Sequence, residues 1–136
     1  MNTQTSRVII EGLAQGRAIA TREALSFWGG VDPNTGCVID VHHALCGVSL
    51  KDTILVMPTS RGSCTGSGVL LDLLLSGRGP AGIIFSEPED VLTLGAIIAA
   101  EMFNKRIPIV RLSADKFEKA NRAREIYIDN HHVIFD

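Results

Sequence analysis

The sequence predicts an α/β fold, with helices packed on a sheet of mixed strand directions. In the middle of the chain, short apolar runs alternate with longer runs rich in leucine or alanine, which is the pattern of a β-α-β-α-β unit. Before and after this unit, short strand-like runs are separated by glycine, proline and asparagine turns. At 136 residues the chain has the length of one domain, so we expect residues 1–136 to form a single domain with a hydrophobic core.

The N-terminal part of the chain is expected to consist of strands and turns. The predicted strands are Arg7–Gly12, Gly16–Ala20, Ala24–Trp28 and Cys37–Asp40. Gly29, Gly30 and the run 32–36 are strong turn signals, and the stretch 41–51 is expected to be loop.

The remaining elements follow the alternation and then return to strands. The predicted order is strand Thr53–Met57, helix Thr65–Leu75, strand Ala81–Phe85, helix Glu89–Ala100, strand Ile107–Arg111, helix Ser113–Ala120, and strands Glu125–Asp129 and His132–Phe135. Gly77 and Gly79 are expected to end the first helix, and Ser113 to act as the N-cap of the third. Two acidic residues at the start of the second helix suit the positive end of its dipole.

The most informative segment is the loop from Pro58 to Gly68, which joins a predicted strand to a predicted helix. It contains small hydroxyl residues, three glycines and Arg61. The N–H groups at a helix start lack intrahelical partners and carry partial positive charge, so this loop is expected to bind an anion. Arg61 adds a bidentate grip on a carboxylate or phosphate. The alternative is ordinary turn chemistry, with Ser63 or Thr65 as the helix N-cap.

Several classes of function are disfavoured. The loop lacks both the Gly-Lys-Ser/Thr ending of a P-loop and the Gly-x-Ser-x-Gly elbow of a hydrolase. The net charge is −2 and the basic residues are scattered, so nucleic acid is not an expected partner. No apolar run approaches about 20 residues and the N-terminus lacks the pattern of a signal peptide, so we expect a cytoplasmic protein without a membrane span.

The three cysteines, Cys37, Cys46 and Cys64, are widely spaced. A disulfide framework is not expected in a reducing compartment. Because the chain has no Cys-x-x-Cys, we interpret the cysteines as buried structural thiols rather than ligands of an iron–sulfur cluster, and we expect no metal ligand on this chain. Cys64 is interpreted as a small loop residue rather than a nucleophile, since no histidine is placed beside it locally.

Five blocks of the sequence resemble the small, swivelling domain of the aconitase X family. The blocks are Leu25–Gly36 (LSFWGGVDPNTG), His42–Leu45 (HHAL), Pro58–Ser63 (PTSRGS), Gly68–Leu71 (GVLL) and Leu94–Ala99 (LGAIIA). The resemblance extends from about Glu11 to Leu112. It implies a swivelling β/β/α domain, like the C-terminal swivel domain of aconitase, in which a β-barrel-like core is flanked by helices.

The resemblance also implies a partner and a reaction. In aconitase-like enzymes this domain closes over a larger domain that carries iron, and the active site lies between them. Since this chain ends at Asp136, we expect the larger part to be a separate large subunit, which carries an iron ion or an iron–sulfur cluster, and this chain to be the small subunit of a heteromeric hydro-lyase. Two substrates are known in the family, cis-3-hydroxy-L-proline and phosphomevalonate. The runs 60–63 and 85–90 favour the first.

The resemblance assigns roles to residues of the loop. Ser63 is expected to be the base that removes the proton next to the substrate carboxylate, and Arg61 to clamp that carboxylate. The other expected substrate contacts are Ser60, Gly62, Cys64, His43 and Ser26. Phe27 and Trp28 are expected at the closing interface.

Simpler interpretations remain open at this stage. Ser63 could be an N-cap, Arg61 part of a surface ion pair, His43 a hydrogen-bonded structural histidine, and the two aromatics ordinary core residues. The rival class of function is a non-catalytic module that uses the same loop to hold an anion.

Overall fold

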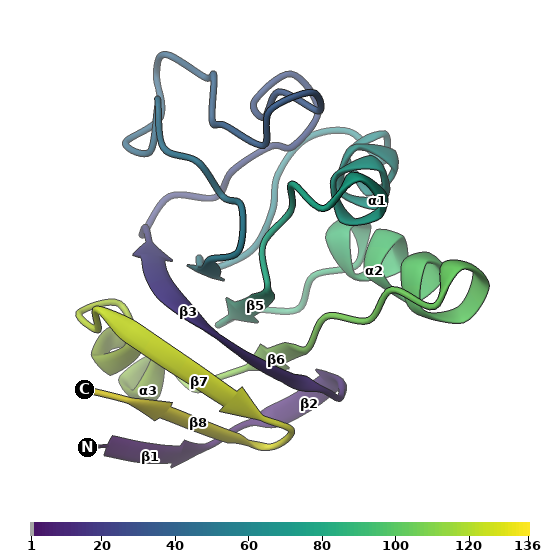
Figure 1. Ribbon diagram of the computed structural model, residues 1–136. Coiled ribbons are helices and arrows are strands. Elements are labelled where there is room, and N and C mark those ends of the chain that lie inside the picture. Colours follow the sequence, from purple (N-terminus) through teal and green to yellow (C-terminus); the bar gives the residue numbers. More distant parts are fainter. Residues whose placement is uncertain (1) are drawn as a thin grey trace.

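The computed structural model describes residues 2–136 and shows helices packed on one curled sheet (Figure 1). The eight strands in this range are β1 (Asn2–Thr5), β2 (Arg7–Ile10), β3 (Leu13–Ala20), β4 (Ile54–Val56), β5 (Gly82–Phe85), β6 (Ile109–Arg111), β7 (Glu125–Asp129) and β8 (His132–Phe135). The three helices are α1 (Gly66–Ser76), α2 (Val91–Phe103) and α3 (Ala114–Ala120). The predicted α/β class and the β-α-β-α-β alternation are confirmed.

The sheet runs in the order β1-β8-β7-β3-β4-β5-β6-β2. Strands β3 to β6 are parallel to one another, whereas β7, β8 and β1 on one side, and β2 on the other, are antiparallel to their neighbours. The two end strands, β1 and β2, are separated in the sequence by Ser6 alone, so the sheet curls until its two edges approach each other (Figure 1). This curl is the barrel-like core that the family resemblance implies.

The central parallel strands are buried on both faces. In β5, Ile83 belongs to the core cluster beneath α1 and α2, while its neighbour Ile84 belongs to the cluster beneath α3. In β6, Ile109 and Val110 divide in the same way. Because successive residues of a strand point to opposite faces, strands covered on both sides need continuous apolar runs, as these have.

Two of the predicted strands, Ala24–Trp28 and Cys37–Asp40, are wrong. In the structure these segments lie in a long loop between β3 and β4 and make only isolated bridges, such as Leu25 with Ser60 and Cys37 with Ser49. Three of their apolar side chains, Leu25, Phe27 and Val38, are buried in the core cluster under α1 and α2, whereas Trp28 and Ile39 are exposed. The apolar pattern in this region therefore reports burial and not strand pairing.

The remaining differences are one additional strand and the ends of several elements. Strand β1 was not expected, because its four residues are polar and mostly exposed. Helix α2 begins two residues later than predicted and continues to Phe103, where Asn104 ends it in the left-handed conformation. Ser113 is the N-cap of α3, as predicted. No helix within residues 2–136 is both long and apolar enough to cross a membrane.

Candidate functional site

The serine loop, residues 58–65, lies at the carboxyl edge of the parallel part of the sheet. It follows β4 directly, and the segments after β3 and β5 lie beside it, since β4 pairs with both of those strands. In open α/β sheets, ligands bind at this edge, where the loops that follow several strands converge. The fold thus places the predicted anion loop where such a site is expected.

The first half of the serine loop is tied to the segment that follows β5. The Pro58 carbonyl accepts hydrogen bonds from the Ser86 and Glu87 N–H groups at 3.1 and 3.0 Å. The Thr59 hydroxyl donates to the Pro88 carbonyl at 3.2 Å, and the Ser60 hydroxyl donates to the Glu89 carboxylate. These bonds, one of them made by the predicted contact residue Ser60, fix the loop before it reaches Arg61 and Ser63.

Glu89 is a residue of the candidate site that the sequence did not single out. Its carboxylate accepts hydrogen bonds from the Leu92 N–H at 2.8 Å, the Thr93 N–H at 3.0 Å, the Thr93 hydroxyl at 3.1 Å and the Ser60 hydroxyl. Glu89 therefore occupies the positive end of α2 and joins that helix to the serine loop. The acidic start of the helix was visible in the sequence, but no signal linked Glu89 to a serine 29 residues away.

The second half of the serine loop is exposed. Arg61, Gly62, Ser63 and Cys64 are all open to solvent. The Ser63 hydroxyl accepts a hydrogen bond from the Thr65 N–H at 3.1 Å and lies 3.0 Å from the Thr65 hydroxyl. The helix N-cap is Thr65, without a side-chain capping bond, so Ser63 is not the N-cap of α1.

The free donors of the candidate anion site differ from those expected. The N–H groups at the start of α1, from Gly66 onward, are already bonded to the carbonyls of residues 63–65. By contrast, the N–H groups of Gly62, Ser63 and Cys64 make no hydrogen bond within residues 2–136. Consecutive free N–H groups around a left-handed residue form an anion-binding concavity, and Gly62 has φ +94°. The loop, rather than the helix end, supplies the free donors.

Ser26 lies directly against Gly62. A Cβ atom at position 62 would collide with the Ser26 hydroxyl, so both the positive φ and the close approach require glycine there. The Ser26 hydroxyl donates to the Trp28 carbonyl at 3.0 Å. The Arg61 N–H also donates to the Leu25 carbonyl at 3.3 Å. The predicted contact residue Ser26 is therefore part of the site's wall.

The two aromatics after Ser26 differ in exposure. Phe27 is buried in the core and 1% exposed, whereas Trp28 is 58% exposed beside the start of α1. The core interpretation applies to Phe27, and only Trp28 is available to a partner.

Arg61 keeps most of its side chain in solvent. Its guanidinium lies 3.7 Å from the Asp40 carboxylate, and its side chain is 57% exposed. A single long contact at an exposed arginine contributes little to stability. It orients the Arg61 side chain, and most of the five guanidinium N–H donors remain available to a ligand.

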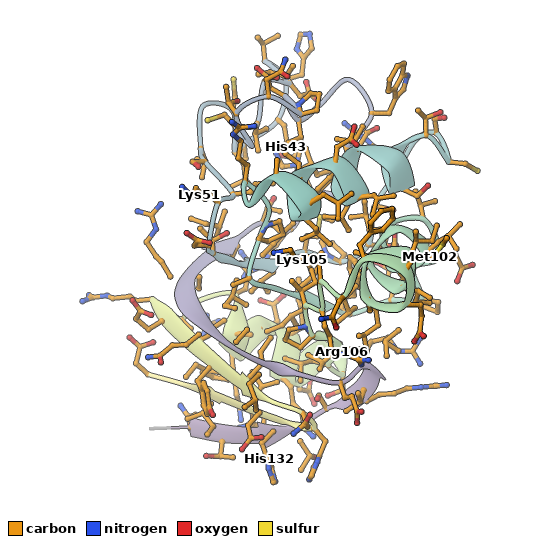
Figure 2. All side chains as sticks on the ribbon, turned by 45° about the vertical axis from the view of Figure 1, so that its right-hand side comes forward. His43, Lys51, Met102, Lys105, Arg106 and His132 are labelled. Carbon is orange, nitrogen blue, oxygen red and sulfur yellow. The ribbon has the colours of Figure 1, made fainter. Side chains whose placement is uncertain are left out.

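His43 is separate from these groups. It is 4% exposed and lies within the loop excursion between β3 and β4 (Figure 2). Its Nδ1 atom accepts the Leu45 N–H at 3.0 Å, which leaves the proton on Nε2, 3.3 Å from the Glu23 carbonyl oxygen. With both ring nitrogens bonded to main chain, the structural interpretation of His43 fits and neither nitrogen is free for a ligand.

The cysteines are more exposed than expected. Cys46 and Cys64 are exposed and Cys37 is half-buried, so the prediction of buried thiols is wrong for the first two. Within residues 2–136 no group of three or more His, Cys, Asp or Glu side chains is placed to hold a metal ion. Residues 2–136 therefore do not fit an iron centre of their own.

Known proteins resemble this chain along most of its length. Residues 3–135 match the aconitase X swivel domain. The chain is 53% identical over 120 residues to the cis-3-hydroxy-L-proline dehydratase of Hypocrea jecorina, an alignment that covers 88% of this chain and 20% of that protein. It is 40% identical over 120 residues to the phosphomevalonate dehydratase small subunit of Thermococcus sibiricus, covering 82% of this chain and 92% of that subunit.

A solved structure carries the same fold. The holo-form crystal structure of Thermococcus kodakaraensis aconitase X superposes with a TM-score of 0.85 at 32% identity, over 100% of this chain and 99% of that chain. The expected swivelling β/β/α fold is thereby confirmed. This chain spans about a fifth of the length of the hydroxyproline dehydratases that it matches.

Proposed function

Because the chain belongs to the aconitase X swivel domain family, we propose that it is the small subunit of a heteromeric hydro-lyase that dehydrates a hydroxy acid. The observation that carries this proposal is the exposed part of the serine loop. There a hydroxyl, three unpaired N–H groups and a guanidinium are exposed together at the carboxyl edge of the sheet. Donors of this kind suit a carboxylate, and their exposure suits a site completed by a second chain.

We propose cis-3-hydroxy-L-proline as the substrate, with 1-pyrroline-2-carboxylate as the product. The base removes the proton from C2, the hydroxyl on C3 leaves as water, and the resulting enamine becomes the cyclic imine. Support comes from the relative of that name, which is 53% identical to this chain, against 40% for the phosphomevalonate dehydratase small subunit. Phosphomevalonate is the second candidate, because the relatives of that name are small subunits of similar length.

In this proposal Ser63 is the base and Arg61 clamps the substrate carboxylate. A serine hydroxyl is a weak base near neutral pH, so an alkoxide at Ser63 needs donors around it. The free N–H groups of the loop are those donors, and Arg61 offsets the negative charge that develops on the carboxylate when the C2 proton leaves. Ser26 and Gly62 form the wall of the loop, Ser60 anchors it, and Cys64 contributes its N–H group. His43 is retained only as support for the neighbouring loop.

The iron centre, as an ion or an iron–sulfur cluster, is assigned to the large subunit. When bound there it would supply the Lewis acid that helps the C3 hydroxyl leave. Every role proposed for this chain concerns binding, orientation or the C2 proton, because its own residues form no metal-ligand cluster within residues 2–136.

The test is turnover by this chain co-expressed with its large partner. Formation of 1-pyrroline-2-carboxylate from cis-3-hydroxy-L-proline should require both chains. Ser63→Ala should abolish turnover while the complex still assembles, whereas Ser76→Ala, which removes a hydroxyl at the far end of α1, should leave turnover unchanged. Full activity in Ser63→Ala would exclude Ser63 as the base.

The same preparation separates the alternatives. Turnover of phosphomevalonate in place of hydroxyproline would reassign the substrate. A chain that forms no complex and binds a carboxylic acid alone would instead support a non-catalytic anion-binding module.

A further inference from the structure

A second group of cations lies on the carboxyl edge of the sheet, two strands away from the serine loop. A groove of about 570 Å³ opens there, next to the ends of β5 and β6. Its polar lining includes Arg7, Arg111, Lys116, Ser6, Ser86 and Ser113. Since neighbouring strands are about 4.8 Å apart, this cationic groove lies on the order of 10 Å from the strand that leads into Ser63.

The two arginines of the cationic groove face each other, and neither forms an ion pair within residues 2–136. Arg7 on β2 and Arg111 on β6 are direct partners in the antiparallel ladder, so their side chains extend from the same face. Like charges in that position repel each other. The ion pairs within residues 2–136 are Arg22 with Glu118 and Arg61 with Asp40, and neither groove arginine has a carboxylate within 4.0 Å.

The groove is also rich in free hydrogen-bond donors. Neither guanidinium makes a hydrogen bond within the described part of the chain. Lys116 donates to the Thr5 carbonyl at 2.9 Å and to the Thr5 hydroxyl at 3.0 Å. The third N–H bond of its ammonium group remains available to a ligand. Ser113 caps α3 without a side-chain hydrogen bond. Such a surface matches a ligand that brings several oxygen acceptors.

Three acidic residues lie beside the groove without forming an ion pair with its arginines. Glu87, Glu89 and Asp90 line a smaller adjoining hollow of about 140 Å³ that shares Arg7 and Arg111. The Glu89 carboxylate is already bonded to α2 and Ser60. The other two carboxylates form no ion pair within residues 2–136.

We propose that the cationic groove docks an acidic segment of the large subunit, with Arg7 and Arg111 gripping its carboxylates. The groove is wide, and Arg7 is exposed rather than enclosed around a small ion. The chain that covers the exposed loop at Ser63 must approach this same edge of the sheet. The inference rests on the proposed function, because it takes the large subunit as the partner. Arginine pairs suit carboxylates, and opposite charges at the edge of an interface accelerate association.

The test compares two charge reversals of equal size. Arg7→Glu with Arg111→Glu changes the groove, and Lys105→Glu with Arg106→Glu makes the same change in net charge in the segment between α2 and β6 (Figure 2). Lys105 and Arg106 precede β6 and therefore lie at the opposite edge of the parallel strands. Association of the full chain with its large subunit is measured at low and high salt.

The groove variant should associate at least about tenfold more slowly at low salt, with a difference that shrinks as salt screens the charges, while the control pair stays near wild type. Arg7→Gln with Arg111→Gln should show a smaller loss in the same direction, with circular dichroism verifying the fold. Equal slowing by both reversals, or none by the groove variant, would overturn the proposal.

Two further results would show that the groove has a different ligand or that the chain has a different function. Inorganic phosphate is titrated into the isolated chain and followed by amide NMR. Saturable binding at Arg7 and Arg111 below about 1 mM, together with unchanged association of the groove variant, would make this a small-anion site instead. Failure of the wild-type chain to form any complex would instead refute the proposed function, and this inference with it.

Discussion

The contribution of the hydrogen bond between Ser60 and Glu89 to the stability of the fold can be predicted quantitatively. In Glu89→Ala, the Leu92 and Thr93 N–H groups lose their acceptor, which costs about 1 kcal/mol in comparable helix caps. The lost charge-assisted bond from Ser60 adds about 1.5 kcal/mol. We therefore expect the free energy of unfolding to fall by about 2.5 kcal/mol, which for a domain of this size lowers Tm by about 9 °C.

A double-mutant cycle isolates the contact that matters for function. The Ser60→Ala, Glu89→Ala and double variants are unfolded in urea, and the coupling free energy between the two positions should be about 1 to 1.5 kcal/mol. Glu101→Ala is the matched control, because Glu101 is an exposed acid in α2 with no side-chain hydrogen bond within residues 2–136. This variant should change the free energy of unfolding by less than about 0.5 kcal/mol. In the complex, Ser60→Ala should lower turnover more than its stability loss explains. A coupling free energy near zero would refute the idea that Glu89 anchors the loop.

Three other changes test neighbouring claims. Gly62→Ala should lose about 1 to 2 kcal/mol in thermal unfolding and most turnover, because φ is +94° and the new methyl group would collide with Ser26; wild-type behaviour would contradict the close approach. His43→Ala should destabilise the chain by about 2 to 3 kcal/mol in urea yet leave turnover per folded complex unchanged; lost turnover in a stable complex would restore a substrate role. A hydrogen bond from Arg22 lowers the pKa of Glu118 in the folded state, so the pair stabilises the fold at pH values above the unfolded-state pKa of Glu118. This stabilisation is lost as the pH falls through the folded-state pKa. Glu118→Gln should therefore lose less stability than wild type between about pH 5 and 3, and identical acid-unfolding profiles would disprove the linkage.

The sequence predicted the parallel part of the sheet well because its strands are buried on both faces. Ile83 and Ile84 contact different core clusters, so β5 had to be an uninterrupted apolar run, and such runs are visible in a single sequence. The segments 24–28 and 37–40 show the same kind of pattern for another reason. Leu25, Phe27 and Val38 are buried by a folded loop, and periodicity alone does not distinguish burial in a loop from burial in a strand.

The candidate site was predicted in its position but only partly in its contacts. A glycine-rich turn between a strand and a helix indicated an anion loop, since that chemistry is local. The contacts that hold the loop are not local: Ser60 meets Glu89, and Gly62 meets Ser26, only after three strands have paired. The same holds for the Arg7–Arg111 pair, which lies across a ladder between residues about 100 positions apart. Sequence spacing carries no signal for pairs created by sheet topology.

The exposure of Ser63 is the physical reason why this chain needs a second one for the proposed reaction. In water, free N–H groups stabilise an alkoxide weakly, because the solvent competes for the same hydrogen bonds and screens the charge of Arg61. Once a partner covers the carboxyl edge, the same donors act in a drier environment and stabilise negative charge far more strongly. The rigid elements are already in place: the loop is anchored through Ser60, and Gly62 is seated against Ser26. The chain thus supplies orientation in advance, and closure by the large subunit would supply the exclusion of water.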